Sequence, residues 1–205
     1  MDRPNAIVFP LLAPKPDESI SALAVDPRRS IVFWSDSING RIYKLEMLKI
    51  DGKPPEQEIL SKSGAENCQG MSVDNVQGLL YYTGWNEPDS RNITDSWITV
   101  MTIDGRFKKT IIDSKNFDKL KKPVQINYID GELYWFDVGY SPPLLFRSSS
   151  TGKKIVEINL KNLDKNSTIE PKSLIIDGSK RLFWTQPTMN KTRVLELSSM
   201  TLHTL

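Results

Sequence analysis

The stretch Leu133-Tyr134-Trp135-Phe136-Asp137 decides the fold, because an aromatic pair followed by a small or polar pair recurs along the chain. The other three pairs are Phe33-Trp34, Tyr81-Tyr82 and Phe183-Trp184. The pairs begin at positions 33, 81, 134 and 183, so the intervals between them are 48, 53 and 49 residues. A period of this size indicates a repeat architecture.

The residues around each pair predict β-strands. A second apolar run lies upstream, across a turn, at residues 20–26, 68–74, 123–130 and 171–177, so each unit predicts a β-hairpin. An alternating run that predicts a third strand follows at residues 41–47, 97–103, 154–160 and 193–197. Residues 56–60 and 108–112 predict a fourth strand in the first two units. Four short antiparallel strands per repeat are typical of a propeller blade, so the predicted fold class is all-β.

At these residues the sequence resembles the YWTD repeat of the LDL receptor class B family, whose repeats combine an L-A-V-D run, a turn and an L-Y-W-T-D run. Leu23-Ala24-Val25-Asp26 and Leu133-Tyr134-Trp135 with Asp137 carry the resemblance most plainly. Gly84 and Gln186 stand where two repeats of the family would have aspartate. The resemblance implies a six-bladed propeller, of which this chain holds about four blades. We therefore expect a piece of a larger ring, and a closed four-bladed ring is the alternative.

The expected organisation is a linker or the tail of a preceding blade at residues 1–19 and a partial propeller at 20–205. Its repeats span about 20–63, 64–115, 116–169 and 170–205.

The resemblance implies structural roles for the motif residues. Its aspartates tie neighbouring blades through hydrogen bonds, and its aromatic pairs pack between blades. The residues concerned are Phe33, Trp34, Asp36, Tyr81, Tyr82, Tyr134, Trp135, Asp137, Phe183 and Trp184, with Asp26 and Asp74 in the preceding strands.

The composition argues against several other classes of protein. Twenty-seven basic and 25 acidic residues leave a formal charge of +2, too little for a nucleic-acid footprint. No apolar run approaches the roughly 18 residues of a membrane span. With one cysteine, Cys68, and one histidine, His203, the chain offers no zinc or redox ligand set and no credible catalytic triad. We expect no cofactor, no metal and no enzymatic activity.

The predicted function is protein binding, as an extracellular module of an LDL receptor-like cell-surface receptor whose partner is a protein ligand or a neighbouring module. Two alternatives stay open. One is a six-bladed metal-dependent hydrolase resembling gluconolactonase, which would hold its ion with inner-strand carboxylates and amides. The other is an architectural spacer in a sevenless-type receptor ectodomain.

Three N-x-Ser/Thr sequons support the extracellular assignment, which rests mainly on the resemblance because residues 6–13 make a poor signal-peptide core. They begin at Asn92, Asn166 and Asn190, which are the candidate glycosylation sites.

Two loops are candidate contact surfaces. Residues 85–96 and 140–151 occupy the same slot after the aromatic motif, so we expect them on the same face. The second loop offers Tyr140, Leu144, Leu145, Phe146 and Arg147, the residue types enriched at interface cores. The alternative is that Leu144 to Phe146 fold back onto their own blade.

Overall fold

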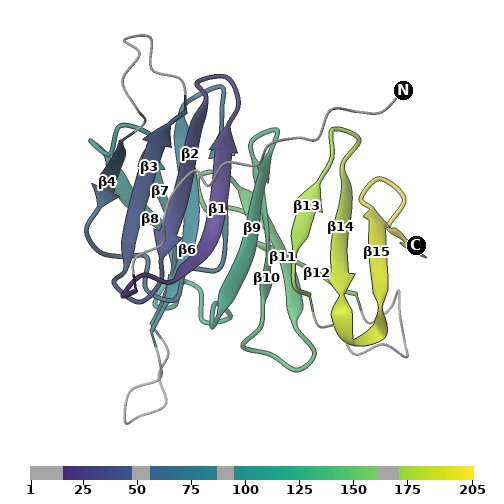
Figure 1. Cartoon of the computed structure of the whole chain (residues 1–205). Helices are drawn as coiled ribbons and strands as arrows, with labels where there is room; N and C mark the ends of the chain where they lie inside the picture. Colours follow the sequence, from purple (N-terminus) through teal and green to yellow (C-terminus); the bar gives the residue numbers. More distant parts are fainter. Residues whose placement is uncertain (1–15, 48–55, 87–94, 161–170) are drawn as a thin grey trace, which may run out of the picture.

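Each repeat folds into one four-stranded antiparallel sheet in a computed structural model that describes residues 16–47, 56–86, 95–160 and 171–205 (Figure 1). Blade 1 holds β1 (Ile20–Asp26), β2 (Ile31–Asp36), β3 (Arg41–Glu46) and β4 (Gln57–Ser61). Blade 2 holds β5 (Met71–Asp74), β6 (Leu79–Trp85), β7 (Ser96–Thr102) and β8 (Lys108–Asp113).

The second half of the chain repeats this plan. Blade 3 holds β9 (Pro123–Ile129), β10 (Glu132–Asp137), β11 (Leu144–Ser149) and β12 (Val156–Ile158). Blade 4 holds β13 (Leu174–Ile176), β14 (Arg181–Gln186), β15 (Lys191–Glu196) and β16 (Thr201–Thr204), with the 3₁₀ turn η1 (Pro187–Met189) between β14 and β15. The strands pair in chain order within each blade, which confirms the all-β prediction of four consecutive four-stranded blades.

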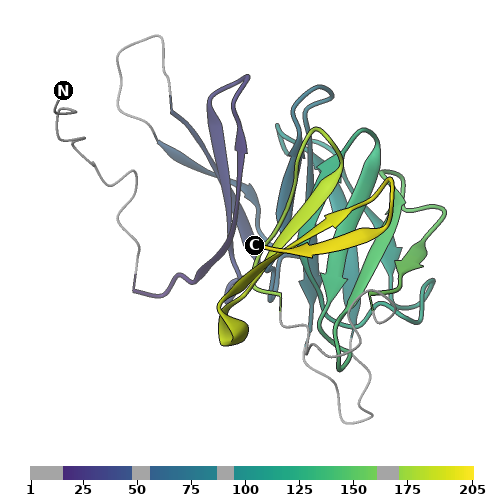
Figure 2. The ribbon, with the colours of Figure 1, turned by 90° about the vertical axis from the view of Figure 1, so that its right-hand side faces the viewer.

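The blades meet through their first strands. β1 contacts β5, β5 contacts β9 and β9 contacts β13, so these strands are the inner strands and β4, β8, β12 and β16 are the outer ones. Figure 2 shows the blades fanned about this inner edge. Within the described ranges, no helix has the length and apolar character needed to cross a membrane.

An aspartate closes the hairpin between the first two strands of three blades. Asp26 Oδ1 accepts the backbone N–H groups of Arg28 and Arg29 at 3.0 and 3.2 Å. Asp74 makes the same two contacts in blade 2. In blade 4, Asp177 accepts the backbone N–H groups of Ser179 and Arg181, two and four residues ahead. A short carboxylate is suited to this turn because it can bond backbone N–H groups two and three residues ahead. Asp26 and Asp74 therefore hold hairpin turns within their own blades.

The aromatic pair of each repeat packs on two faces of its blade, because successive strand residues point to opposite sides. Tyr134 lies in the core between blades 3 and 4, and Trp135 lies in the core between blades 2 and 3. Tyr81 and Tyr82 divide in the same way between the two neighbours of blade 2. Phe33 faces blade 2, whereas Trp34 lies on the other face of blade 1, stacked on Tyr43.

The same alternation distinguishes the pair of blade 4. Trp184 is buried against blade 3. Phe183 is only partly buried and lies on the opposite face of the blade, with the Arg181 guanidinium 5.6 Å from its ring centre. The two aromatics of a pair thus lie on opposite faces of their blade.

Blade 3 corrects one strand assignment. Residues 154–160 were expected to form its third strand, but β11 (Leu144–Ser149) takes that position and β12 (Val156–Ile158) is the fourth strand. Both runs alternate apolar and polar residues, and β11 is the more deeply buried of the two strands. Leu145 and Phe146 are at most 1% exposed, whereas Val156 and Ile158 of β12 are 45% and 8% exposed. The connection between β10 and β11 is therefore only residues 138–143.

Candidate functional site: a polar pocket shared by four blades

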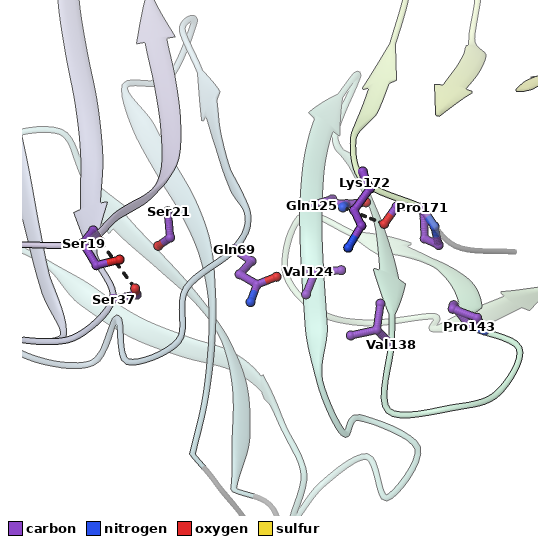
Figure 3. Close-up of a pocket in the computed structure, with 10 residues that line it drawn as sticks. All are labelled: Ser19, Ser21, Ser37, Gln69, Val124, Gln125, Val138, Pro143, Pro171 and Lys172. Carbon is purple, nitrogen blue, oxygen red and sulfur yellow. Dashed lines mark hydrogen bonds between the residues drawn. The ribbon is translucent and has the colours of Figure 1, made fainter. Parts of the chain in front are cut away.

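A pocket of about 560 Å³ opens where the inner strands of all four blades begin (Figure 3). Blade 1 and the segment before it supply serines, and blade 4 and the segment before it supply Pro171 and Lys172 on the other side. The lining residues are Ser19, Ser21, Ser37, Gln69, Val124, Gln125, Val138, Pro143, Pro171 and Lys172.

One repeat position supplies the most polar part of the lining. Ser21, Gln69, Gln125 and Lys172 each stand five residues before the residue that ends the first-strand run, at positions 26, 74, 130 and 177. Because the blades are repeats, equivalent positions meet at the same end of the inner strands. Each blade thus contributes one side chain to the shared pocket, and the residue type is not the same in every blade.

Gln125 bridges three blades from this position. Its backbone N–H donates to Gln69 O and its Nε2 donates to Pro171 O, both at 3.0 Å. It lies at a β-bulge in β9 with φ of +55°, a conformation that a residue with a Cβ adopts at a cost in energy. Its Oε1 is buried and has no hydrogen-bond partner within the described part of the chain. A strained residue with an unused acceptor is therefore located in the pocket wall.

The blade 1 side of the pocket is built from serines. Ser37 N–H donates to Ser19 O at 3.0 Å, which pins the segment leading into β1. The Ser21 hydroxyl donates to Cys68 O of the segment leading into β5. This bond joins blades 1 and 2 at the pocket.

Two lysines paired with aromatic rings lie in the segment leading into blade 3. Lys122 Nζ is 4.3 Å from the ring centre of Trp85, and Lys121 Nζ is 4.6 Å from that of Tyr140. Tyr140 is partly buried, and its hydroxyl donates to Lys119 O at 3.0 Å. Tyr140 therefore anchors the 138–143 connection to the segment that leads into blade 3.

The motif aspartates of blades 1 and 3 hold the lead-in segments, by which we mean the residues just before each inner strand. Asp137 accepts the backbone N–H groups of Lys121, Lys122 and Gly139 at 2.7, 2.9 and 2.9 Å. Asp36 accepts the N–H of Ser19 at 3.1 Å and two N–H donors of Asn39, at 3.3 Å from the backbone and 2.6 Å from the side chain. Asp137 thereby joins blade 3 to the segment arriving from blade 2.

Burial acts on the two carboxyls in the same direction, but the balance differs. Burial raises the pKa of Asp137 above its ordinary value despite the three backbone donors. Burial also works to raise the pKa of Asp36, but the hydrogen bonds from Asn39 and Ser19 outweigh it, so the pKa of Asp36 is lowered.

Blades 2 and 4 reach a similar end without the aspartate. Gly84 stands directly opposite Trp97 in the sheet, and the Trp97 indole N–H donates at 2.9 Å to Gly64 O in the segment leading into blade 2. In blade 4, Gln186 Oε1 accepts from Arg193 Nε at 2.8 Å, and Lys172 N–H donates to Thr185 O. Sequence reasoning recorded Gly84 and Gln186 only as departures from the family pattern.

The predicted contact residues of blade 3 divide into two groups. Leu145 and Phe146 are 0% and 1% exposed and lie in the cores with blades 4 and 2. They therefore offer no surface to a partner, because β11 is a blade strand rather than part of a loop. Leu144 packs partly against the core with blade 2, and Arg147 Nη1 lies 3.7 Å from Glu132 Oε1. The structure brings none of these four residues into the pocket lining.

Only one of the three sequon asparagines lies within the described residues. Asn190 is exposed and follows η1. Asn92 and Asn166 lie outside the described residues.

The pocket residues were missed by sequence reasoning, although a signal for them existed. Aligning the repeats on their first-strand runs places a polar residue at one fixed position in every blade, and its identity is not the same in all of them. That pattern is typical of a surface that varies on a constant scaffold. Lys172 is the one charged side chain among the residues that line the pocket.

The pocket lining offers hydrogen-bonding groups. Serine hydroxyls, two carboxamides and one ammonium surround apolar valines and prolines. The described residues contain no group of three histidine, cysteine, aspartate or glutamate side chains placed to hold a metal ion. Such a mixed lining is suited to a peptide side chain or a small polar group.

No protein-family model matches the chain. Curated relatives are the cueball proteins of fruit flies. That of Drosophila ananassae is 28% identical over 173 residues, which is 84% of this chain and 25% of the relative. That of Drosophila willistoni is 24% identical over 170 residues, 82% of this chain and 24% of the relative. The chain thus spans about a quarter of the length of these relatives.

Solved structures agree on the fold. The nidogen/laminin complex matches with a TM-score of 0.63 at 17% identity, over 93% of this chain and 81% of that one. Virginiamycin B lyase from Staphylococcus aureus matches with a TM-score of 0.61 at 18% identity, over 94% and 57% of the two chains. The four sheets are blades of the six-bladed propeller type. The chain is a relative of the LDL receptor class B, or YWTD, propellers and is related in sequence to the cueball proteins.

Proposed function

We propose that this chain is an extracellular protein-binding module that receives a short peptide segment of its partner in the pocket shared by the four blades. The observation that carries the proposal is the lining itself, in which Ser21, Gln69, Gln125 and Lys172 converge from different blades at one repeat position.

The proposal fits the energetics of recognition. A peptide side chain entering the pocket would meet the exposed Gln69 carboxamide and the Lys172 ammonium, and would cover the exposed face of Val138. Hydrogen bonds to these polar groups and burial of apolar surface both favour binding. The matching nidogen structure is a complex with laminin, so a propeller of this fold can take part in a protein complex.

The hydrolase alternative finds less support. A gluconolactonase-like site would need carboxylates converging from separate inner strands on a metal ion. The pocket lining contains serine and glutamine side chains and one lysine at the equivalent strand position. The similarity to a lyase, at 18% identity, concerns the fold.

A phage-displayed library of short random peptides tests the proposal. Peptides selected on the wild-type chain are synthesised and their Kd is measured by fluorescence anisotropy against Q69A/K172A. Both side chains are exposed at the pocket, so their removal should leave the melting temperature unchanged and weaken binding about tenfold or more.

The matched control is F107S, because Phe107 is 58% exposed in the connection between β7 and β8, at the other end of the strands from the pocket. Binding should survive this substitution. Peptides that bind Q69A/K172A as tightly as wild type, or failure to select any peptide, would contradict the proposal and favour an architectural spacer.

A further inference from the structure

The turn between β14 and β15 presents an asparagine with an exposed side chain. Asn190 is the residue after η1, with φ of 51° and ψ of 45°, and its backbone N–H donates to Pro187 O at 3.1 Å. The left-handed conformation suits asparagine. Its side chain makes no hydrogen bond within the described residues, unlike Asn67 and Asn127, whose amides donate to backbone carbonyls.

The rest of the sequon is accessible too. Lys191 is exposed and Thr192 is partly exposed at the start of β15, where it pairs with Thr185. The backbone of the sequon is thus fixed by the turn and the strand. A sugar added at Asn190 would displace no core side chain, as a surface acceptor site requires.

The position of this turn decides what a glycan would cover. The β14–β15 turn is equivalent to the β10–β11 connection, which supplies Val138 and Pro143 to the pocket. Both connections lie at the lower ends of their blades in Figure 1, where β1 begins. Asn190 is therefore on the pocket face, in the blade that supplies Lys172.

We propose that Asn190 carries an N-linked glycan on the rim of blade 4, and that this glycan leaves the pocket open to a partner approaching over blades 1 to 3. The second half of the proposal rests on the proposed binding function, and the first half does not.

The first experiment locates the glycan. The 205-residue chain is secreted from insect cells behind a heterologous signal sequence, and its intact mass is compared before and after peptide N-glycosidase treatment. We expect conversion of Asn190 to aspartate in the peptide map. T192V should abolish glycosylation of Asn190, because it removes the sequon hydroxyl while keeping a β-branched residue in the strand. T192S keeps the hydroxyl and should keep the glycan. An unmodified Asn190 in the secreted chain would overturn the proposal.

The second experiment tests the placement with the peptides selected above. Loss of the native glycan in T192V should change their Kd by less than about twofold. D17N creates a new N-x-Ser sequon with Glu18 and the pocket residue Ser19, on the opposite rim, and its glycan should weaken binding at least tenfold. D17Q is the matched control without a sequon.

The outcomes separate the two proposals. A tenfold change in T192V, or no loss in glycosylated D17N, would overturn the placement. An occupied Asn190 in a chain that binds no peptide would overturn the binding function and the placement while the glycan site stands.

Discussion

Blades 1 and 3 fasten their lead-in segments with a buried carboxylate, whereas blade 2 does so with an indole. Asp137 gathers three backbone N–H groups, and Trp97 instead donates one N–H to a backbone carbonyl. The direction of the hydrogen bond is therefore reversed, because the side chain donates in blade 2 and accepts in blade 3. The glycine opposite Trp97 makes room for the indole ring. The difference teaches that the repeat needs a fastened lead-in segment more than it needs an aspartate.

Restoring the family residue in blade 2 should have the largest effect. A Cβ at Gly84 would lie 2.3 Å from Trp97 Nε1, so G84D both clashes with the indole and buries a charge. We expect a loss of about 3 kcal/mol or more in the free energy of unfolding, measured by urea denaturation. G84D/W97S removes the obstruction and should recover at least half of that loss. No recovery in the double variant would show that the Gly84–Trp97 pair does not replace the motif aspartate in fastening the lead-in segment.

Removing the carboxylate of blade 3 should come next. D137A leaves the N–H groups of Lys121, Lys122 and Gly139 without their acceptor, and an unsatisfied buried donor costs about 1 to 3 kcal/mol. Because solvent can reach part of the lead-in segment, we expect a total of about 3 kcal/mol. Hydrogen exchange should show the faster opening at Lys121 and Lys122 and no change at Ser19. Uniform loss of protection over all four blades would mean that Asp137 does not act on its own lead-in segment.

The pH dependence gives the smallest and most selective comparison of the two carboxyls. The lowered pKa of Asp36 means that its contribution is present above the ordinary value of 3.8 and is lost as pH falls through the lowered pKa. The raised pKa of Asp137 has the opposite sign, since its contribution is present below 3.8 and is lost as pH rises through the raised pKa.

Unfolding free energies of wild type, D36N and D137N between about pH 3 and 7 check this contrast. On acidification, the unfolding free energy of wild type should fall relative to that of D36N and rise relative to that of D137N. Parallel curves for the two variants would contradict the assignment of opposite shifts.

The repeat itself was predictable because its signal is local. Aromatic pairs at a steady interval, alternating apolar residues and turn residues between them specify hairpins wherever they occur, so the strands of blades 1 and 2 were found nearly at their observed bounds. Residues 144–149 and 154–160 carry the same alternation, and local pattern alone could not rank them. Burial of Leu145 and Phe146 between neighbouring blades made that choice.

The sequence by itself determined an all-β chain of four YWTD-like repeats, with an aromatic pair in each that must face two ways. The tertiary structure alone decided which side chains share a surface. Ser21 and Lys172 are 151 positions apart, from 21 to 172, yet line one pocket, because the inner strands of successive blades begin at the same end of a common axis. Likewise, Trp97 can stand in for an aspartate only because the sheet register sets it across from Gly84. The pocket depends on the packing of blades against one another, which no window of sequence contains.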